Sequence, residues 1–189
     1  MDKKYELRCK KHIKDDVTKT KHTLYRIRAL RDVGSVKAGE YGGYIESEDN
    51  LSHDNVCWIF DDAWVGEHAK VSGNAVVCGT AKIYNNAMMY GNAYISENAH
   101  IFGSAHVFGS TYIHGDARIC ESARVSGRCE LFGDTKISGD AQISTCSICS
   151  NNIKLDHSIW NQLAKIDDKW YIISSTLQKI LLGNNTHDE

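Results

Sequence analysis

The chain has 189 residues, of which 42% are hydrophobic and none is proline, and its net charge is −2. This composition is typical of a folded globular protein rather than a disordered chain. No apolar run approaches the roughly 18 residues needed to cross a bilayer, and the charged opening MDKKYELRCKKHIKDD does not resemble a signal peptide. We therefore expect a cytoplasmic protein without a membrane partner. The seven cysteines are odd in number, which favours free thiols in a reducing compartment over a disulfide framework.

Residues 1–58 are predicted to form an N-terminal cap based on a β-hairpin. Tyr5–Ile13 and Thr23–Leu30 both have strand-like composition, and the polar stretch KDDVTKTK separates them. Residues 1–42 carry twelve Lys/Arg against six Asp/Glu, a balance of +6, whereas the remainder carries ten against eighteen, a balance of −8. This basic end could meet an acidic partner or nucleic acid, or it could be a solvated hairpin whose lysines deter edge-to-edge pairing.

Residues 59–148 consist of fifteen consecutive six-residue units of the form aliphatic, x, Gly/Glu/Asn, polar, small, x. Because side chains alternate along a strand, the triplet small-x-aliphatic points both of its ends inward, and a glycine-rich corner follows it. Three units make an 18-residue triangular coil. The repeat therefore predicts an all-β fold, a left-handed parallel β-helix of about five coils. Strict spacing disfavours a β-sandwich, whose strands recur irregularly every 8 to about 12 residues.

Residues 149–189 are predicted to form a C-terminal cap of strand and helix. A short amphipathic helix is expected over residues 153–163, the sequence DDKWYII reads as a turn and a strand, and a last helix carries Leu177, Ile180 and Leu181. Just before this cap, Cys146 and Cys149 form a C-x-x-C pair. With no second ligand pair at a fitting distance, this pair is a weak metal signal, and we expect no metal.

Residues one coil apart stack in columns, so the outward positions on the three faces can be read from the sequence. Face one is mostly apolar or aromatic, and a contiguous apolar strip usually marks an interface. We predict that it packs against a cap or a second subunit in a homo-oligomer, either a dimer or a trimer. Its predicted interface residues are Trp58, Phe60, Val76, Tyr94, Tyr112 and Phe132.

Face two is predicted to bind an anionic partner. Four successive basic or potentially basic side chains about 4.8 Å apart repel one another, and the adjacent rings give a strip of the kind that holds phosphate and stacks bases. The predicted site is Lys82, His100, Arg118, Lys136, Tyr84 and Phe102. Alternatively, carboxylates at the neighbouring corners neutralise the column in place. Those carboxylates are Glu97, Asp116, Glu121 and Asp134.

Face three is mixed and could serve either purpose. Its columns consist of Lys70, Met88, His106, Arg124 and Gln142 beside Ser72, Tyr90, Phe108, Ser126 and Ser144.

Two segments outside the hexads carry a family resemblance. The stretch Leu24–Val65, with its GGYIE box at Gly42–Glu46, resembles the opening segment of the YdcK-type left-handed β-helix proteins, small hexapeptide-repeat proteins of bacteria and their phages. The stretch Asp167–Gly183 is similar to the tail of the short phage or prophage members. The resemblance implies a phage- or prophage-encoded accessory protein that binds a host component, such as part of a defence system. It carries over no catalytic residue.

Two functions from different classes remain open. One is a hexapeptide-repeat acyltransferase using acetyl-coenzyme A, which needs a general base near a thioester in a cleft shaped by an extruded loop. His100, His106 and His114 face outward, but every unit is six residues long and no carboxylate is clearly placed to orient a histidine. The other, which we expect, is a non-enzymatic scaffold with no catalytic residue and no cofactor, binding a macromolecular partner that is protein rather than nucleic acid.

Overall fold

The computed structural model describes most of the chain, and every regular element in its described part is a strand except one short 3-10 turn, η1 (Glu48–Asn50). The residues described in full are 3–14, 19–144 and 154–155, and the backbone alone is described for 161–166, 169–174 and 179–181. No helix among these residues is long and apolar enough to cross a membrane.

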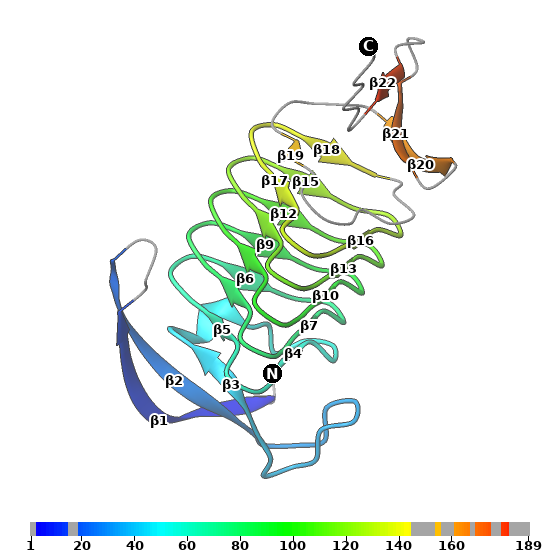
Figure 1. Ribbon diagram of the computed structural model, residues 1–189. Coiled ribbons are helices and arrows are strands. Elements are labelled where there is room, and N and C mark those ends of the chain that lie inside the picture. Colours follow the sequence, from blue (N-terminus) through cyan, green and yellow to red (C-terminus); the bar gives the residue numbers. More distant parts are fainter. Residues whose placement is uncertain are drawn as a thin grey trace.

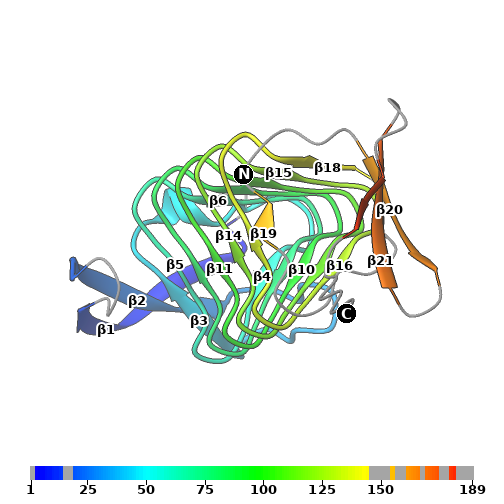
Figure 2. The same cartoon turned by 45° about the horizontal axis from the view of Figure 1, so that its top comes forward.

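The body is a left-handed parallel β-helix, as the hexads predict, and its coils lie one over the next along a common axis (Figures 1 and 2). Face one consists of β4 (Trp58–Ile59), β7 (Val76–Val77), β10 (Tyr94–Ile95), β13 (Tyr112–Ile113) and β16 (Glu130–Leu131). Face two consists of β5 (Trp64–Val65), β8 (Lys82–Ile83), β11 (His100–Ile101), β14 (Arg118–Ile119), β17 (Lys136–Ile137) and β19 (Lys154–Leu155). Face three consists of β6 (Lys70–Val71), β9 (Met88–Met89), β12 (His106–Val107), β15 (Arg124–Val125) and β18 (Gln142–Ile143).

The core is a stack of aliphatic side chains, with the small residues of the repeat beside them. Ile83, Ile101 and Ile119 pair in register on face two, and each has 0% exposure. Burying each such side chain contributes about 1.5–3 kcal/mol. The backbone joins the coils as well, since alternate N–H groups donate to carbonyls of the next coil, as from Lys82 N to Ala99 O at 3.0 Å.

The solenoid begins one coil earlier than the hexads indicate. Ile45, in β3 (Tyr41–Ile45), pairs in parallel with Val65, and Leu51 bridges to Val71. Both pairs are 20 residues apart in the sequence, two more than the 18 of the regular coils, and η1 lies within this longer coil. The GGYIE box is therefore part of the first coil rather than a linker.

The acidic and amide residues at the corners bond to the coil above. Asp61, Asn85, Glu97 and Glu121 all have positive φ, between 54° and 61°. In each case a side-chain oxygen accepts the N–H of the glycine 18 residues on, at 2.8–3.1 Å. The alternation of Gly with Glu, Asn or Asp in the third hexad position therefore has a physical cause. A glycine removes the strain of positive φ, while a side chain supplies an inter-coil hydrogen bond.

The N-terminal hairpin is confirmed. β1 (Tyr5–Lys14) pairs antiparallel with β2 (Lys21–Ala29), and β2 pairs antiparallel with β3, so the hairpin extends the sheet of face two. The register shifts between Arg8 and Lys10, where Cys9 has a φ of 38°. A bulge on a lysine-rich edge strand opposes pairing with another chain.

At the other end, the described backbone forms a separate antiparallel sheet of β20 (Asn161–Ile166), β21 (Lys169–Ser174) and β22 (Lys179–Leu181). The strand within DDKWYII is confirmed, but the helices predicted on either side of it are wrong, because β20 and β22 both pair with β21. The spacing of a short apolar run cannot by itself distinguish a helix from a strand. Here both runs form strands because they pair with the strand-forming segment WYII in β21. Cys146, Cys149 and Ile153 lie outside the described residues.

Replacing Ile101 by alanine removes a fully buried side chain from the middle of the stack. The inter-coil hydrogen bonds hold the neighbouring strands in place, so the space cannot close. We expect the free energy of unfolding to fall by about 2–5 kcal/mol, measured by chemical denaturation. Ser104→Ala, at an exposed corner, should change it by no more than about 0.5 kcal/mol. Equal losses in the two variants would contradict the stacked core.

Candidate functional site

The N-terminal half of face two lies under the hairpin. Leu24, Trp64 and Tyr84 form a second buried cluster, and Ile13 and Phe102 pack against it. Tyr84 is only 1% exposed, and its ring is stacked on that of Trp64 at 5.6 Å and on that of Phe102 at 5.3 Å. The prediction that Tyr84 is available to a partner is therefore wrong, and Phe102 is half-buried. An outward position in the repeat is exposed only where nothing packs over it, and the hairpin covers this part of the face.

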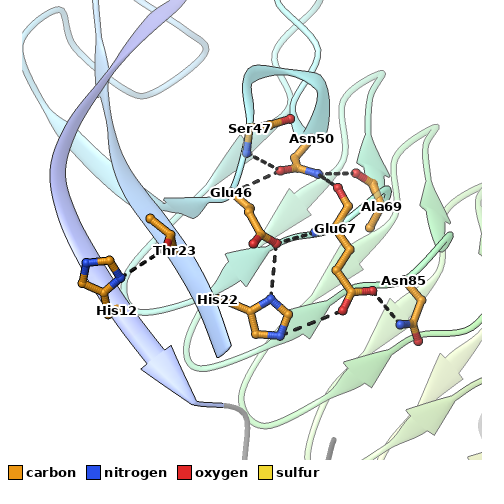
Figure 3. Close-up of polar contacts among 9 residues, drawn as sticks. All are labelled: His12, His22, Thr23, Glu46, Ser47, Asn50, Glu67, Ala69 and Asn85. Carbon is orange, nitrogen blue, oxygen red and sulfur yellow. Dashed lines mark hydrogen bonds and ion pairs between the residues drawn. The ribbon is translucent and has the colours of Figure 1, made fainter. Parts of the chain in front are cut away.

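A polar junction fixes the hairpin to the first coils (Figure 3). His22, at the start of β2, is buried against the Trp64 ring at 5.0 Å. Its Nδ1 lies 3.3 Å from Glu46 Oε2, and its Nε2 lies 4.0 Å from Glu67 Oε1. Glu67 also accepts a hydrogen bond from Asn85 Nδ2 at 2.6 Å. No sequence pattern indicates this junction, since its members lie in four separate segments of the chain.

Asn50 supports the same junction from inside the first coil. Its Oδ1 accepts the backbone N–H of Glu46 at 3.1 Å and of Ser47 at 2.7 Å. Its Nδ2 donates to the carbonyls of Glu67 at 3.0 Å and Ala69 at 2.9 Å. Figure 3 shows these bonds beside His22, whereas the His12–Thr23 pair lies apart on the hairpin. The covered half of face two is therefore held by a connected set of contacts.

The C-terminal half of face two is open and cationic. Arg118, Lys136 and Lys154 are exposed and stand in adjacent registered pairs, about 4.8 Å apart at their backbones. The neighbouring side chains of Cys120 and Ser138 are small and buried, so they do not project between the cations. We call Arg118, Lys136 and Lys154 the cationic ladder. Sequence reasoning missed Lys154 because residues 153–163 were assigned to a helix.

The other two predicted cations lie closer to the hairpin. Lys82 and His100 continue the column in register from Trp64 toward Arg118, and both are half-buried. The predicted column therefore exists as a structural row, but its exposure increases toward the C-terminal end.

Among the described residues, the corner carboxylates that the alternative invokes form no direct ion pair with the ladder. Glu97 and Glu121 accept backbone N–H groups of the next coil, and Asp116 and Asp134 are exposed. Within the part of the chain that the structure describes, no carboxylate forms an ion pair with Arg118, Lys136 or Lys154. The ladder thus presents three like charges whose mutual repulsion a bound anion would relieve.

Face one carries the predicted aromatic strip in its middle and C-terminal part. Tyr94 is 37% exposed and Tyr112 is 39% exposed, and their rings are 5.0 Å apart. The row continues through His114 to the half-buried Phe132, whose ring is stacked on His114 at 5.3 Å. This surface can bury apolar area against a second molecule.

The N-terminal part of face one is a groove rather than a flat strip. Trp58 is only 1% exposed, and its ring lies 6.3 Å from that of Tyr5, so at this position face one packs against the cap, one of the two predicted alternatives, and is not available to a second subunit. The turn Val33–Val36 stands over this end and forms a groove of about 490 Å³ with Val76, Cys78 and Tyr94. Phe60 and Val76 remain half-buried along it.

His114 has carboxylate neighbours that the sequence did not indicate. Its Nε2 lies 3.4 Å from Glu130 Oε1, and its Nδ1 lies 3.8 Å from Glu97 Oε1. The expectation that no carboxylate orients an outward histidine is therefore wrong at this position. Both ring nitrogens face carboxylates, however, whereas a general base needs one nitrogen directed at its substrate.

The thiol of Cys78 lies in the groove and donates a hydrogen bond to the Tyr94 hydroxyl at 3.0 Å. Burial raises the pKa of the Cys78 thiol, and the hydrogen bond to Tyr94 partly opposes this shift. The same hydrogen bond raises the pKa of Tyr94 to about 12. Both groups are therefore neutral near pH 7, which makes the thiol a poor nucleophile.

Neither metal ligands nor relatives add to this geometry. Among the described residues, no three His, Cys, Asp or Glu side chains are placed to hold a metal ion. Comparison with protein-family models and with curated proteins finds no match to this chain.

The environment of Cys78 predicts its reactivity. At neutral pH we expect Cys78 to be alkylated more slowly than the exposed Cys9, because a raised pKa reduces the thiolate fraction. Peptide mass mapping over a time course of iodoacetamide treatment measures both rates. Equal rates at the two thiols would mean that Cys78 is open to solvent and that face one is not covered.

Proposed function

We propose that this protein is a non-enzymatic binding scaffold whose cationic ladder holds an acidic segment of a partner protein. The observation that carries the proposal is the row of Arg118, Lys136 and Lys154, exposed, in register and without a carboxylate partner among the described residues. The inter-coil hydrogen bonds make the face rigid, so binding costs little ordering of the scaffold itself. The backbone N–H and C=O groups of the face form hydrogen bonds between coils, so a partner is recognised by the outward side chains.

The surrounding charge favours protein over nucleic acid as the partner. Residues 43–189 carry ten Lys/Arg against eighteen Asp/Glu, and the exposed Asp116 and Asp134 line one edge of the ladder. The dense, continuous charge of a nucleic acid backbone would meet these carboxylates as well as the cations. An acidic protein segment can place its few carboxylates opposite the ladder alone, and such local complementarity gives specificity.

Two observations support a scaffold over the alternative acyltransferase. The described hexads keep one length and extrude no loop that could shape a cleft for a thioester. His114 has both ring nitrogens directed at carboxylates. Isotope-labelled acetyl-coenzyme A offered to pooled acceptors tests the alternative directly, and turnover that is lost in His114→Asn would replace our proposal.

Other aspects of the proposal rest on sequence pattern. The resemblance to YdcK-type proteins supports a phage- or prophage-encoded accessory protein in the cytoplasm of the bacterium or infected host cell, acting on a host component such as part of a defence system. The exposed rings of Tyr94 and Tyr112 support a homo-oligomer, either a dimer or a trimer, with face one buried between copies.

Charge reversal of the ladder tests the binding face. The double variant Arg118→Glu/Lys136→Glu should bind a labelled glutamate-rich peptide about tenfold more weakly than the wild type, since two charge contacts of about 0.5–1 kcal/mol each are lost. Fluorescence anisotropy at low and moderate salt measures the dissociation constant. The matched control is Lys70→Glu/Arg124→Glu, which reverses two exposed cations on face three and should leave binding nearly unchanged.

Two outcomes would contradict the proposal. Equal weakening in both double variants would mean that net charge rather than the ladder attracts the peptide. Tighter binding of a single-stranded oligonucleotide of equal formal charge, again lost on ladder reversal, would assign the face to nucleic acid instead.

A further inference from the structure

A lysine is buried at the start of the hairpin. Lys4 has 0% exposure, and its Nζ lies where the open end of the solenoid meets β1. This nitrogen donates to the carbonyl of Cys57 at 2.9 Å, to Cys57 Sγ at 3.1 Å and to the carbonyl of Asp54 at 3.4 Å. Buried lysines are rare, and this one points its amine at a thiol.

The thiol is close to the surface although its own exposure is 0%. Cys57 follows the exposed residues Asp54, Asn55 and Val56, and Asn55 has a φ of 55°. The sulfur is in contact with this loop, since Cys57 Sγ lies 3.7 Å from the carbonyl oxygen of the exposed Asp54. Local opening of a loop at the end of the solenoid needs far less free energy than global unfolding, and it lets a small oxidant reach the sulfur.

We propose that Lys4 and Cys57 form a reversible covalent sulfur–nitrogen bond when the protein meets hydrogen peroxide. The proposal is independent of the binding function, because it rests on the contact between these two side chains. Two groups that are already 3.1 Å apart need little movement to react.

The bond forms in two steps. The sulfur of Cys57 attacks one oxygen of peroxide, the O–O bond breaks, and the leaving hydroxide takes the thiol proton, giving a sulfenic acid and one water. The lone pair of Lys4 Nζ then attacks the sulfur and the S–O bond breaks. The departing hydroxide takes one amine proton as a second water. Sulfur is oxidised by two electrons and one peroxide is reduced.

The surroundings favour the second step. Burial lowers the pKa of the Lys4 ammonium, although the neighbouring Cys57 opposes the shift, so a larger fraction of the amine is neutral and nucleophilic. Exclusion of bulk water slows competing chemistry at the sulfenic acid. Other thiols have different neighbours, since Cys78 donates to the Tyr94 hydroxyl and Cys129 to the Ser126 carbonyl.

The cross-link would tie the first strand to the first coil. It joins residues 53 apart in the chain, so it closes a long loop that includes the whole hairpin. Cross-links of long loops oppose unfolding by restricting the unfolded chain. Oxidation would thereby tie the base of the hairpin to the start of β4, and a thiol reductant would release it.

Peptide mapping of the native wild-type protein tests the proposal. After peroxide treatment and removal of excess oxidant, we expect a linked peptide pair joining Lys4 to Cys57, with a mass lower by two hydrogens than the sum of the free peptides. Dithiothreitol should restore both free peptides. The linked species should also show a higher midpoint of thermal unfolding than the reduced protein, and the shift should disappear on reduction.

Variants locate the bond. Lys4→Arg keeps a cation but lacks the lysine amine, and Cys57→Ser lacks the sulfur, so neither should give the linked pair. Cys129→Ser, which removes another buried thiol, should give it at the wild-type level. Should Lys4→Arg fail to fold, the wild-type map still decides. Conversion of Cys57 to sulfinic acid without linkage, or an unmodified Cys57 while Cys9 is oxidised, would overturn the proposal.

Discussion

The parallel hydrogen bonds between coils are the constraint on which the rest of the structure depends. Alternate backbone N–H groups of a rung donate to carbonyls of the next coil, as from His100 N to Ala117 O at 2.9 Å. Because the regular coils keep the 18-residue spacing, each outward side chain lies in register with its counterpart on the next coil. The same bonds consume the backbone polar groups of the faces. A face built this way can act only through its outward side chains.

The carbonyls of each coil accept N–H groups of the coil before it, but the first coil has no coil before it. Side chains of the N-terminal cap supply the missing donors. Tyr5 donates through its hydroxyl to the carbonyl of Leu51 at 2.7 Å. Lys4 does the same for the carbonyl of Cys57. Unpaired buried carbonyls are costly. The buried polar residues of the cap are therefore explained by the open end of the sheet, which also brings an amine against a thiol.

Sequence reasoning succeeded where structure follows from local period and failed where distant segments meet. The hexads predicted the coils, the inward Ile101 and the registered column through Arg118, because these depend only on alternation and spacing. They could not predict that Leu24 covers Tyr84, or that Glu130 meets His114, since neither contact has a fixed spacing in the chain. The apolar runs of the C-terminal segment were ambiguous, and strand pairing with β21 decided them.

The hairpin divides face two into a covered aromatic half and an exposed cationic half. It buries the rings of Trp64 and Tyr84 and leaves Arg118, Lys136 and Lys154 as the exposed part of the column. A partner that binds the cationic half of face two contacts charged side chains and little apolar surface. Such contacts are weakened by salt and dissociate readily. Face one keeps exposed rings at Tyr94 and Tyr112, which favour burial of apolar area and a longer-lived contact. In the proposed scaffold, face one would therefore serve lasting association and face two the exchangeable capture of an acidic segment.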